Sequence, residues 1–142
     1  MHPFLRFLQR LARDQKVRFL AVGAVNTGLG FALFVTFDLL VFRSVPFGYL
    51  ISLAVSYSIA ITVAFVLYRR FVFQVSGRIV SDFLKFIGVY VVAIGVNAAA
   101  LPVLVEIVDL SPLLAQGIVL VCTTAISYFG HRGFSFRRPS KG

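Results

Sequence analysis

Four long apolar runs dominate the chain, and short polar segments separate them. The runs extend from Phe19 to Phe42, Phe47 to Tyr68, Phe83 to Val105 and Pro112 to Gly130. Each is close to the ~20 residues that a helix needs to cross the ~30 Å hydrocarbon core of a bilayer. Because the runs are continuously apolar and do not alternate polar with apolar positions, we exclude barrel strands. The pattern therefore predicts four membrane-spanning helices.

A shorter amphipathic segment, from His2 to Lys16, precedes the first apolar run. Its apolar positions fall on one helical face, and its arginines fall largely on the others. The apolar positions are Phe4, Leu8, Leu11 and Ala12, and the arginines are Arg6, Arg10 and Arg13. This pattern is typical of a helix that lies in the membrane interface. A cleaved signal peptide is less favoured, because the apolar run exceeds the usual ~7–15 residues and no small-x-small site follows it.

The composition fits this picture and narrows the function. Of the 142 residues, 59% are hydrophobic and 13% are charged, which is too little polar surface for a water-soluble globule of this size. We therefore predict an all-α integral membrane protein, a four-helix bundle with an N-terminal interfacial helix. The net charge of +9 comes from cations between the apolar runs, where membrane topology explains them, so we expect no nucleic-acid partner.

The residue patterns that would mark an enzyme are missing from the sequence. It contains no Ser-His-Asp set, no paired carboxylates within a span, no metal-spaced ligands and no phosphate-cradling glycine loop. The single cysteine, Cys122, lies inside an apolar run and is most simply a packing residue. We therefore expect no enzyme activity, catalytic residue, metal or cofactor.

The cations are distributed unequally between the two sides of the predicted membrane. Every lysine and arginine except Arg43, with Lys141 included, belongs to segments that share one side. Because lysine and arginine accumulate on the cytoplasmic side, we expect both termini in the cytoplasm and the chain in the cytoplasmic (inner) membrane. No Asp, Glu or Lys is expected in the middle of a span, which disfavours a proton-coupled drug exporter.

The chain carries one short motif twice, Arg-x-Phe-x-Phe, at residues 69–73 and 132–136. Each half also opens on a basic residue followed by Phe and places an asparagine in its first apolar run. The opening pairs are Arg18-Phe19 and Lys85-Phe86, and the asparagines are Asn26 and Asn97. We therefore predict two tandem repeats, residues 17–73 and 83–136, within a single membrane domain of residues 1–142.

The predicted repeats share one orientation, because each holds two spans. They form a parallel repeat, so alternating access by exchange of inverted halves is not implied. If the protein moves a substrate across the bilayer, we expect the symmetry of that movement to come from a homodimer.

Basic side chains gather where the second span of each repeat ends. They are Arg69, Arg70, His131 and Arg132. An arginine offers a planar fork of donors that can hold a phosphate through two hydrogen bonds, and we predict a binding site for a lipid headgroup phosphate here. Plain anchoring of the helices in the membrane is the alternative. Phenylalanines continue at every second position after the arginines, which predicts that the chain leaves the helix and runs extended along the interface.

Polar side chains inside the spans suggest a route for a sugar. An unpaired amide in hydrocarbon is costly, so Asn26 and Asn97 should face the bundle interior. We assign them, with Tyr57 and Tyr128, to a polar route that contacts the substrate, and hydrogen bonds between helices are the alternative. The second span also carries small residues at every fourth position, which predicts close helix packing. They are Ser52, Ser56, Ala60 and Ala64.

These motifs resemble the GtrA-like family of small four-helix membrane proteins. The family's opening pattern, basic-Phe-x-x-Val-Gly-x-x-Asn-Thr, is matched here by Arg18, Phe19, Val22, Gly23, Asn26 and Thr27. Its closing pattern, Asn-Arg-x-Trp-x-Phe, is matched in part at residues 68–73 and again at 131–136. In the two copies Tyr68 and His131 replace the family's Asn, and Phe71 and Phe134 replace its Trp.

The resemblance implies a role in cell-envelope polysaccharide or O-antigen modification. Such proteins move a polyprenyl-phosphate-linked sugar to the outer leaflet after a membrane glycosyltransferase has made it. Our leading hypothesis is therefore a flippase, or a flippase component, whose partners are this lipid-linked sugar, membrane lipids and a glycosyltransferase. The alternative is a non-transporting anchor or regulator that recruits the glycosyltransferase. A small multidrug-type exporter is less favoured.

Overall fold

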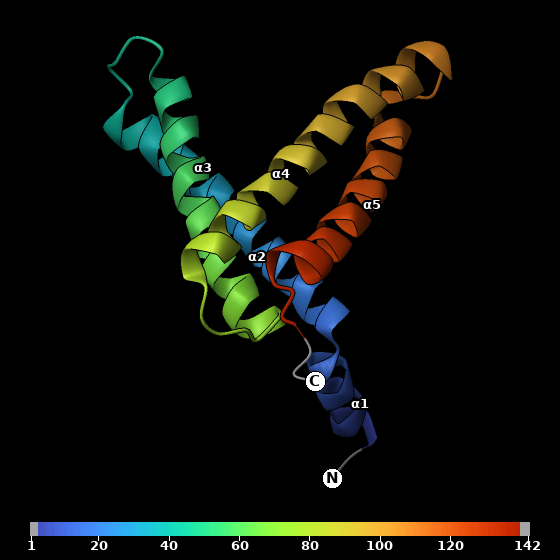
Figure 1. Ribbon diagram of the computed structural model, residues 1–142. Coiled ribbons are helices and arrows are strands. Elements are labelled where there is room, and N and C mark those ends of the chain that lie inside the picture. The colour runs from blue at the N-terminus through green and yellow to red at the C-terminus, as the bar shows by residue number, and fades with distance from the viewer. Residues whose placement is uncertain (1–2, 140–142) are drawn as a thin grey trace. The chain divides into compact units, whose positions relative to one another are not determined.

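The computed structural model describes residues 3–139, apart from the side chains of Phe4, Phe7, Pro112 and Leu113, and no strand occurs in that range (Figure 1). A short helix is followed by four long ones. The helices are α1 (Pro3–Arg13), α2 (Gln15–Thr36), α3 (Gly48–Leu67), α4 (Ile79–Pro102) and α5 (Pro112–Gly130). The predicted first residue of the amphipathic helix, His2, the side chain of Phe4 and the cation Lys141 lie outside the described residues.

Each long helix continues into one wider, π-helical turn, in which a backbone N–H bonds to the carbonyl five residues earlier. These turns are η1 (Phe37–Val41), η2 (Tyr68–Val72), η3 (Val103–Ile107) and η4 (His131–Ser135). Together they give four segments long and apolar enough to cross a membrane, Gln15–Val41, Gly48–Val72, Ile79–Ile107 and Leu114–Ser135. The chain is a multi-pass membrane protein, and the predicted all-α, four-helix membrane class is confirmed.

The helix boundaries differ from the predicted ones at both ends. The first and third long helices begin earlier than predicted, at Gln15 and Ile79. Their first turns contain polar or charged residues, which end an apolar run although the backbone is already helical. Asp14 separates α1 from α2, because its backbone is extended and its side chain accepts a hydrogen bond from the N–H of Lys16 at 2.8 Å. That bond caps the start of α2.

The extended segment predicted after the arginines is wrong, because the chain stays helical there. In both copies the N–H of the last phenylalanine bonds to the carbonyl five residues earlier at 2.9 Å. Side chains two positions apart lie on nearly opposite sides of a helix. Phe71 and Phe134 are therefore exposed, whereas Phe73 and Phe136 turn inward. The alternation of the phenylalanines reflects one inward and one outward ring on a helical turn.

The described chain divides into two compact units after Gln74, in the segment between the two predicted repeats. The first unit contains α1, α2 and α3, and the second contains α4 and α5. In each unit the two long helices form an antiparallel pair joined by a short turn, as Figure 1 shows for α2 with α3 and for α4 with α5.

Helices α2 and α3 of the first unit pack through small residues. The stripe predicted on α3 is buried: Ser52, Ser56, Ala60 and Ala64 are each at most 6% exposed. A β-carbon added to Gly30 of α2 would lie 3.7 Å from that of Ala60, so the two backbones approach closely here. Close packing of this kind holds helices together in lipid, where apolar side chains gain nothing by leaving the solvent.

Helices α4 and α5 of the second unit approach closely where Gly130 faces Val89. A β-carbon at Gly130 would lie 2.9 Å from Cγ1 of Val89, which is closer than real side chains come. Phe86, Val89 and Val119 are buried in the same unit. This contact sets the end of α5 against the start of α4.

The helix α1 forms as predicted over a shorter range. Leu5, Leu8 and Leu11 are 47%, 43% and 37% exposed, so its leucines are not packed into the protein. The arginines Arg6 and Arg10 are exposed as well. An apolar face that the protein leaves uncovered, beside a basic one, is what a helix in the membrane interface requires.

Candidate functional site

Each helix pair carries most of its cations at one end, which we call the basic end. It consists of the start of the first helix and the last turn of the second. These are residues 15–19 and 68–73 in the first unit, and residues 78–86 and 131–139 in the second. Cations are favourable near the last turn of a helix, where unpaired carbonyls concentrate negative partial charge.

An aromatic cluster closes the basic end of the first unit. Phe19 stacks on Tyr68 with ring centroids 4.9 Å apart, and Phe73 meets Phe19 edge-on at 6.5 Å. Both Phe19 and Tyr68 are 5% exposed. The guanidinium of Arg18 donates to the carbonyl of Val72 at 3.2 Å, which satisfies one acceptor of the helix end.

The second unit builds the same cluster from the corresponding residues. Phe86 stacks on His131 with ring centroids 4.3 Å apart, and Phe136 lies 6.0 Å from Phe86. His131 also shares a hydrogen bond between its Nδ1 and the hydroxyl of Ser135, at 3.1 Å. All four residues are buried.

The repeated motif therefore has a packing role. In each copy the phenylalanine that opens the repeat packs on the residue before the motif's arginine and on the motif's last phenylalanine. His131 is 1% exposed and lies between these rings, so it does not face the surface where a headgroup would bind. Its side chain is therefore not available to a headgroup phosphate.

The predicted arginines lie on the last turns of α3 and α5. Arg69 and Arg70 belong to the first unit and Arg132 to the second. Arg70 and Arg132 are exposed, and the guanidinium of Arg70 lies 5.9 Å from the ring centroid of Phe71. Arg69 is half-buried.

The residues of the predicted polar route occupy different environments. Asn26 and Asn97 are half-buried, Tyr57 is 56% exposed on α3, and Tyr128 is 7% exposed on α5. The side-chain oxygen of Asn26 is buried and has no hydrogen-bond partner within the described residues. The interhelical hydrogen bond proposed as the alternative for that oxygen is therefore not formed.

Arg138 clamps the segment after α5 to the start of α4. Its guanidinium forms a bidentate ion pair with Asp82, at 2.9 and 2.7 Å, and donates to the carbonyls of Ser76 at 2.8 Å and Gly77 at 3.1 Å. The side chain of Asp82 is 2% exposed. The hydrogen bond to Asp82 raises the pKa of Arg138 above its ordinary value. A buried carboxylate needs such a partner, so the clamp fixes both segments.

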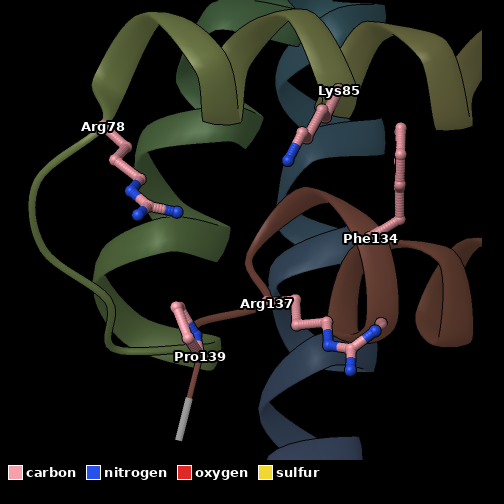
Figure 2. Close-up of a pocket in the computed structure, with 6 residues that line it drawn as sticks. Arg78, Lys85, Phe134, Arg137 and Pro139 are labelled. Carbon is pink, nitrogen blue, oxygen red and sulfur yellow. The ribbon is translucent and has the colours of Figure 1, made fainter. Parts of the chain in front are cut away.

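An open cationic pocket lies at the basic end of the second unit (Figure 2). Its volume is about 400 Å³, and it is lined by Arg78, Lys85, Gly133, Phe134, Arg137 and Pro139. Figure 2 shows Arg78 and Lys85 reaching from the start of α4 towards the segment that carries Arg137. Among residues 3–139, no carboxylate pairs with any of these three cations. Their charge is available to an anion.

Two local features position the pocket's cations. The ammonium of Lys85 lies 5.3 Å from the ring centroid of Phe134, within range of a cation–π interaction. Gly77 and Arg78 both have left-handed backbones, with φ of 67° and 50°. Glycine adopts this conformation freely, whereas it costs arginine about 1–2 kcal/mol. The bonds from Arg138 to the carbonyls of Ser76 and Gly77 hold this turn in place.

The cationic pocket was not predicted, although a comparison of the two copies carries the signal for it. When the Arg-x-Phe-x-Phe motifs are superimposed in sequence, Gln74 and Val75 of the first copy correspond to Arg137 and Arg138 of the second. Charge therefore appears in the second copy at positions that are neutral in the first. The motif shows only the residues that the two copies share, whereas the pocket depends on a charge that only the second copy has.

A family model described as GtrA/DPMS, transmembrane domain, matches residues 18–136. The chain belongs to this family. The match begins at Arg18 and ends at Phe136, so it takes in both helix pairs and both aromatic clusters. No curated protein and no solved structure gives a significant match to the chain. Membership of the GtrA/DPMS family connects the protein with the translocation of lipid-linked sugars or with glycosylation.

Proposed function

We propose that this protein is a flippase, or a component of one, for a polyprenyl-phosphate-linked sugar used to build cell-envelope polysaccharide or O-antigen. The observation that carries the proposal is the family match, which extends over both helix pairs. The substrate class combines an anionic phosphate, a polar sugar and a long apolar tail. Its polar part must cross the hydrocarbon core, and a membrane domain with polar groups within its spans provides a path.

Exposed cations at the basic ends support capture of the phosphate. Arg70 and Arg132 are open to the surroundings, and Arg69 precedes Arg70 in sequence. We assign these ends to the cytoplasmic side, where lysine and arginine accumulate and where a newly made lipid-linked sugar is met. Asn26 and Asn97 then line the route of the sugar, and the buried, unpaired oxygen of Asn26 can accept a hydrogen bond from a sugar hydroxyl.

Reconstitution of the purified protein in liposomes tests the proposal. A fluorescent polyprenyl-phosphate sugar is placed in both leaflets, and a membrane-impermeant reductant then destroys the label outside. Protein-free liposomes should lose about half of the signal, and protein-containing ones nearly all of it. Equal loss in both preparations would contradict transport by this chain alone. Arg69→Gln combined with Arg132→Gln should abolish the extra loss without lowering the amount of folded protein, and an unchanged loss would exclude these two arginines.

The uncovered face of α1 favours a second function, a membrane anchor that recruits a glycosyltransferase. The exposed leucines and arginines of α1 can contact a partner as well as lipid. In this case liposomes with the chain alone show no translocation, whereas the glycosyltransferase sediments with them only when the chain is present. Removal of α1 should then abolish sedimentation and leave the helix pairs folded.

A further inference from the structure

An apolar groove adjoins the cationic pocket of the second unit. Its volume is about 260 Å³, and it is lined by Gly88, Val89, Val92, Ile126, Gly130 and Phe134. None of these residues has a polar side chain. Gly88 keeps the surface of α4 low here, because it presents no side chain and nothing lies within 4 Å of where its β-carbon would be. Phe134 belongs to the lining of both the pocket and the groove, so the two adjoin at this residue.

We infer that the second helix pair holds one phosphate-bearing isoprenoid lipid, with its phosphate in the cationic pocket and the first units of its chain in the apolar groove. In this pocket Arg78, Lys85 and Arg137 are the phosphate ligands, in addition to the arginines assigned to the first capture of the phosphate. Phe134 covers the junction between phosphate and chain. This inference rests on the proposed function and names the place where its substrate is held.

The chemistry of the two cavities selects an amphiphile. A neutral lipid would leave three cations without a counter-charge, and a free phosphate would leave the apolar groove and the half-exposed ring of Phe134 uncovered. The two arginines can each grip phosphate oxygens with a planar fork, while Lys85 contributes a point charge. Because the pocket is open to solvent, the attraction is screened by salt, and affinity should fall as ionic strength rises.

The corresponding position of the first unit is engaged in structural bonds. Arg18, which opens the first repeat as Lys85 opens the second, donates to the carbonyl of Arg13 at 2.8 Å and to that of Val72 at 3.2 Å. Gln74 stands where the second copy has Arg137. Each helix pair therefore has its own aromatic cluster of the same kind, but the two pairs differ in surface charge. We assign the lipid to the second pair.

A tryptophan placed at Phe134 tests the site directly, because the natural chain contains no tryptophan. The Phe134→Trp variant is placed in phosphatidylcholine nanodiscs and titrated with a polyprenyl monophosphate. A bound chain removes water from the indole, so we expect a saturable blue shift of its emission. The control is Phe31→Trp, an exposed position of α2 in the first unit that lies away from the basic end. It should show no saturable shift.

Loss of the pocket's charge should weaken this binding. In the Phe134→Trp background, Lys85→Gln with Arg137→Gln should raise the apparent Kd by about tenfold or more, since two charge-assisted contacts are lost. Arg6→Gln with Arg10→Gln removes the same net charge from α1 and should leave the Kd unchanged. An unchanged Kd in the pocket variant, or an equal shift in the Phe31→Trp control, would overturn the assignment.

Three further ligands identify what the site recognises. Polyprenol has the chain without the phosphate, inorganic phosphate has the anion without the chain, and phosphatidylglycerol is an anionic lipid without an isoprenoid chain. We expect none of them to reproduce the shift at the concentrations that saturate with polyprenyl monophosphate. An equal response to any one of them would overturn the assignment to an isoprenoid phosphate.

Failure of this site and failure of the proposed function give different results. If liposomes show translocation but Phe134→Trp does not respond to the lipid, the function stands and the site is wrong. If Phe134→Trp binds the lipid and the pocket variant loses it, but the natural protein moves no lipid, the site stands and the flippase proposal is wrong.

Discussion

At the scale of single residues, Asp82 and Arg138 show how buried charge organises the second unit. Asp82 is almost inaccessible, and its carboxylate receives both terminal nitrogens of one guanidinium. The same guanidinium binds two carbonyls of the loop before α4, so one side chain joins three stretches of backbone. Arg78 precedes α4 and Arg137 precedes the clamp, and their separation across the pocket therefore depends on it.

Arg138→Gln is expected to destabilise the protein by about 1–3 kcal/mol, because it removes one charged partner of a buried carboxylate and the side chain it replaces is partly exposed. Thermal unfolding in detergent should show a lower midpoint. Arg132→Gln is the control, since Arg132 is exposed on the preceding turn, and its midpoint should stay within experimental error. Equal midpoints for the Arg138 variant and the natural protein would show that the clamp is not stabilising.

At the scale of elements, each helix pair depends on the close approach of its two helices and on its own aromatic cluster. The first pair approaches through a stripe of small residues on α3, and the second through Gly130 against Val89. In each pair the cluster then closes the basic end. The two pairs therefore use different contacts along their length but the same aromatic cluster at the basic end. This explains why the Arg-x-Phe-x-Phe motif recurs there while the residues between the ends differ.

Gly130→Ala is expected to destabilise the second pair by about 1–3 kcal/mol, because the new methyl group would overlap the stiff, β-branched side chain of Val89. Gly117→Ala on the same helix is the matched control, since nothing lies within 4 Å of its added β-carbon. Helix propensity favours both changes equally, by about 1 kcal/mol. The difference between the two midpoints of thermal unfolding therefore measures the overlap, and a zero difference would contradict it.

At the scale of the whole molecule, the chain consists of two helix pairs that both belong to the membrane. The family match covers both. The charge pattern predicts that the two basic ends, together with both termini, face the cytoplasm, and that the turns between paired helices face the opposite side. This arrangement would present the cationic pocket to lipids made at the cytoplasmic surface.

Single cysteines test this topology. In a Cys122→Ala background, Ser44→Cys lies in the turn between α2 and α3, and Ser76→Cys lies in the loop before α4. A membrane-impermeant maleimide added to intact cells should label the first variant at once and the second only after permeabilisation, because the reagent cannot reach the cytoplasm. Labelling of Ser76→Cys in intact cells, or of both variants alike, would contradict the predicted orientation.

Periodicity and composition predicted most of the fold, because a bilayer accepts few solutions. An apolar run near 20 residues must be helical for its backbone to be satisfied in lipid, so the four helices followed from length alone. The first turns of α2 and α4 were not predicted, because they contain polar or charged residues. The helical course of the segments around Phe71 and Phe134 was not predicted either. Phenylalanines at every second position occur both in an extended chain and on a helical turn with one ring inward and one outward.

The sequence by itself determined the membrane class, the four spans, the repeated Arg-x-Phe-x-Phe motif and the small-residue stripe of α3, all of which follow from local composition and spacing. Only the tertiary structure decided which basic residues share a pocket. His131 is buried by Phe86, a residue far from it in the chain, and the pocket forms where the start of α4 meets the segment after α5. A sequence shows how many charged residues a chain has and how they are spaced. A binding site needs several of them close together in space, and packing decides which ones meet.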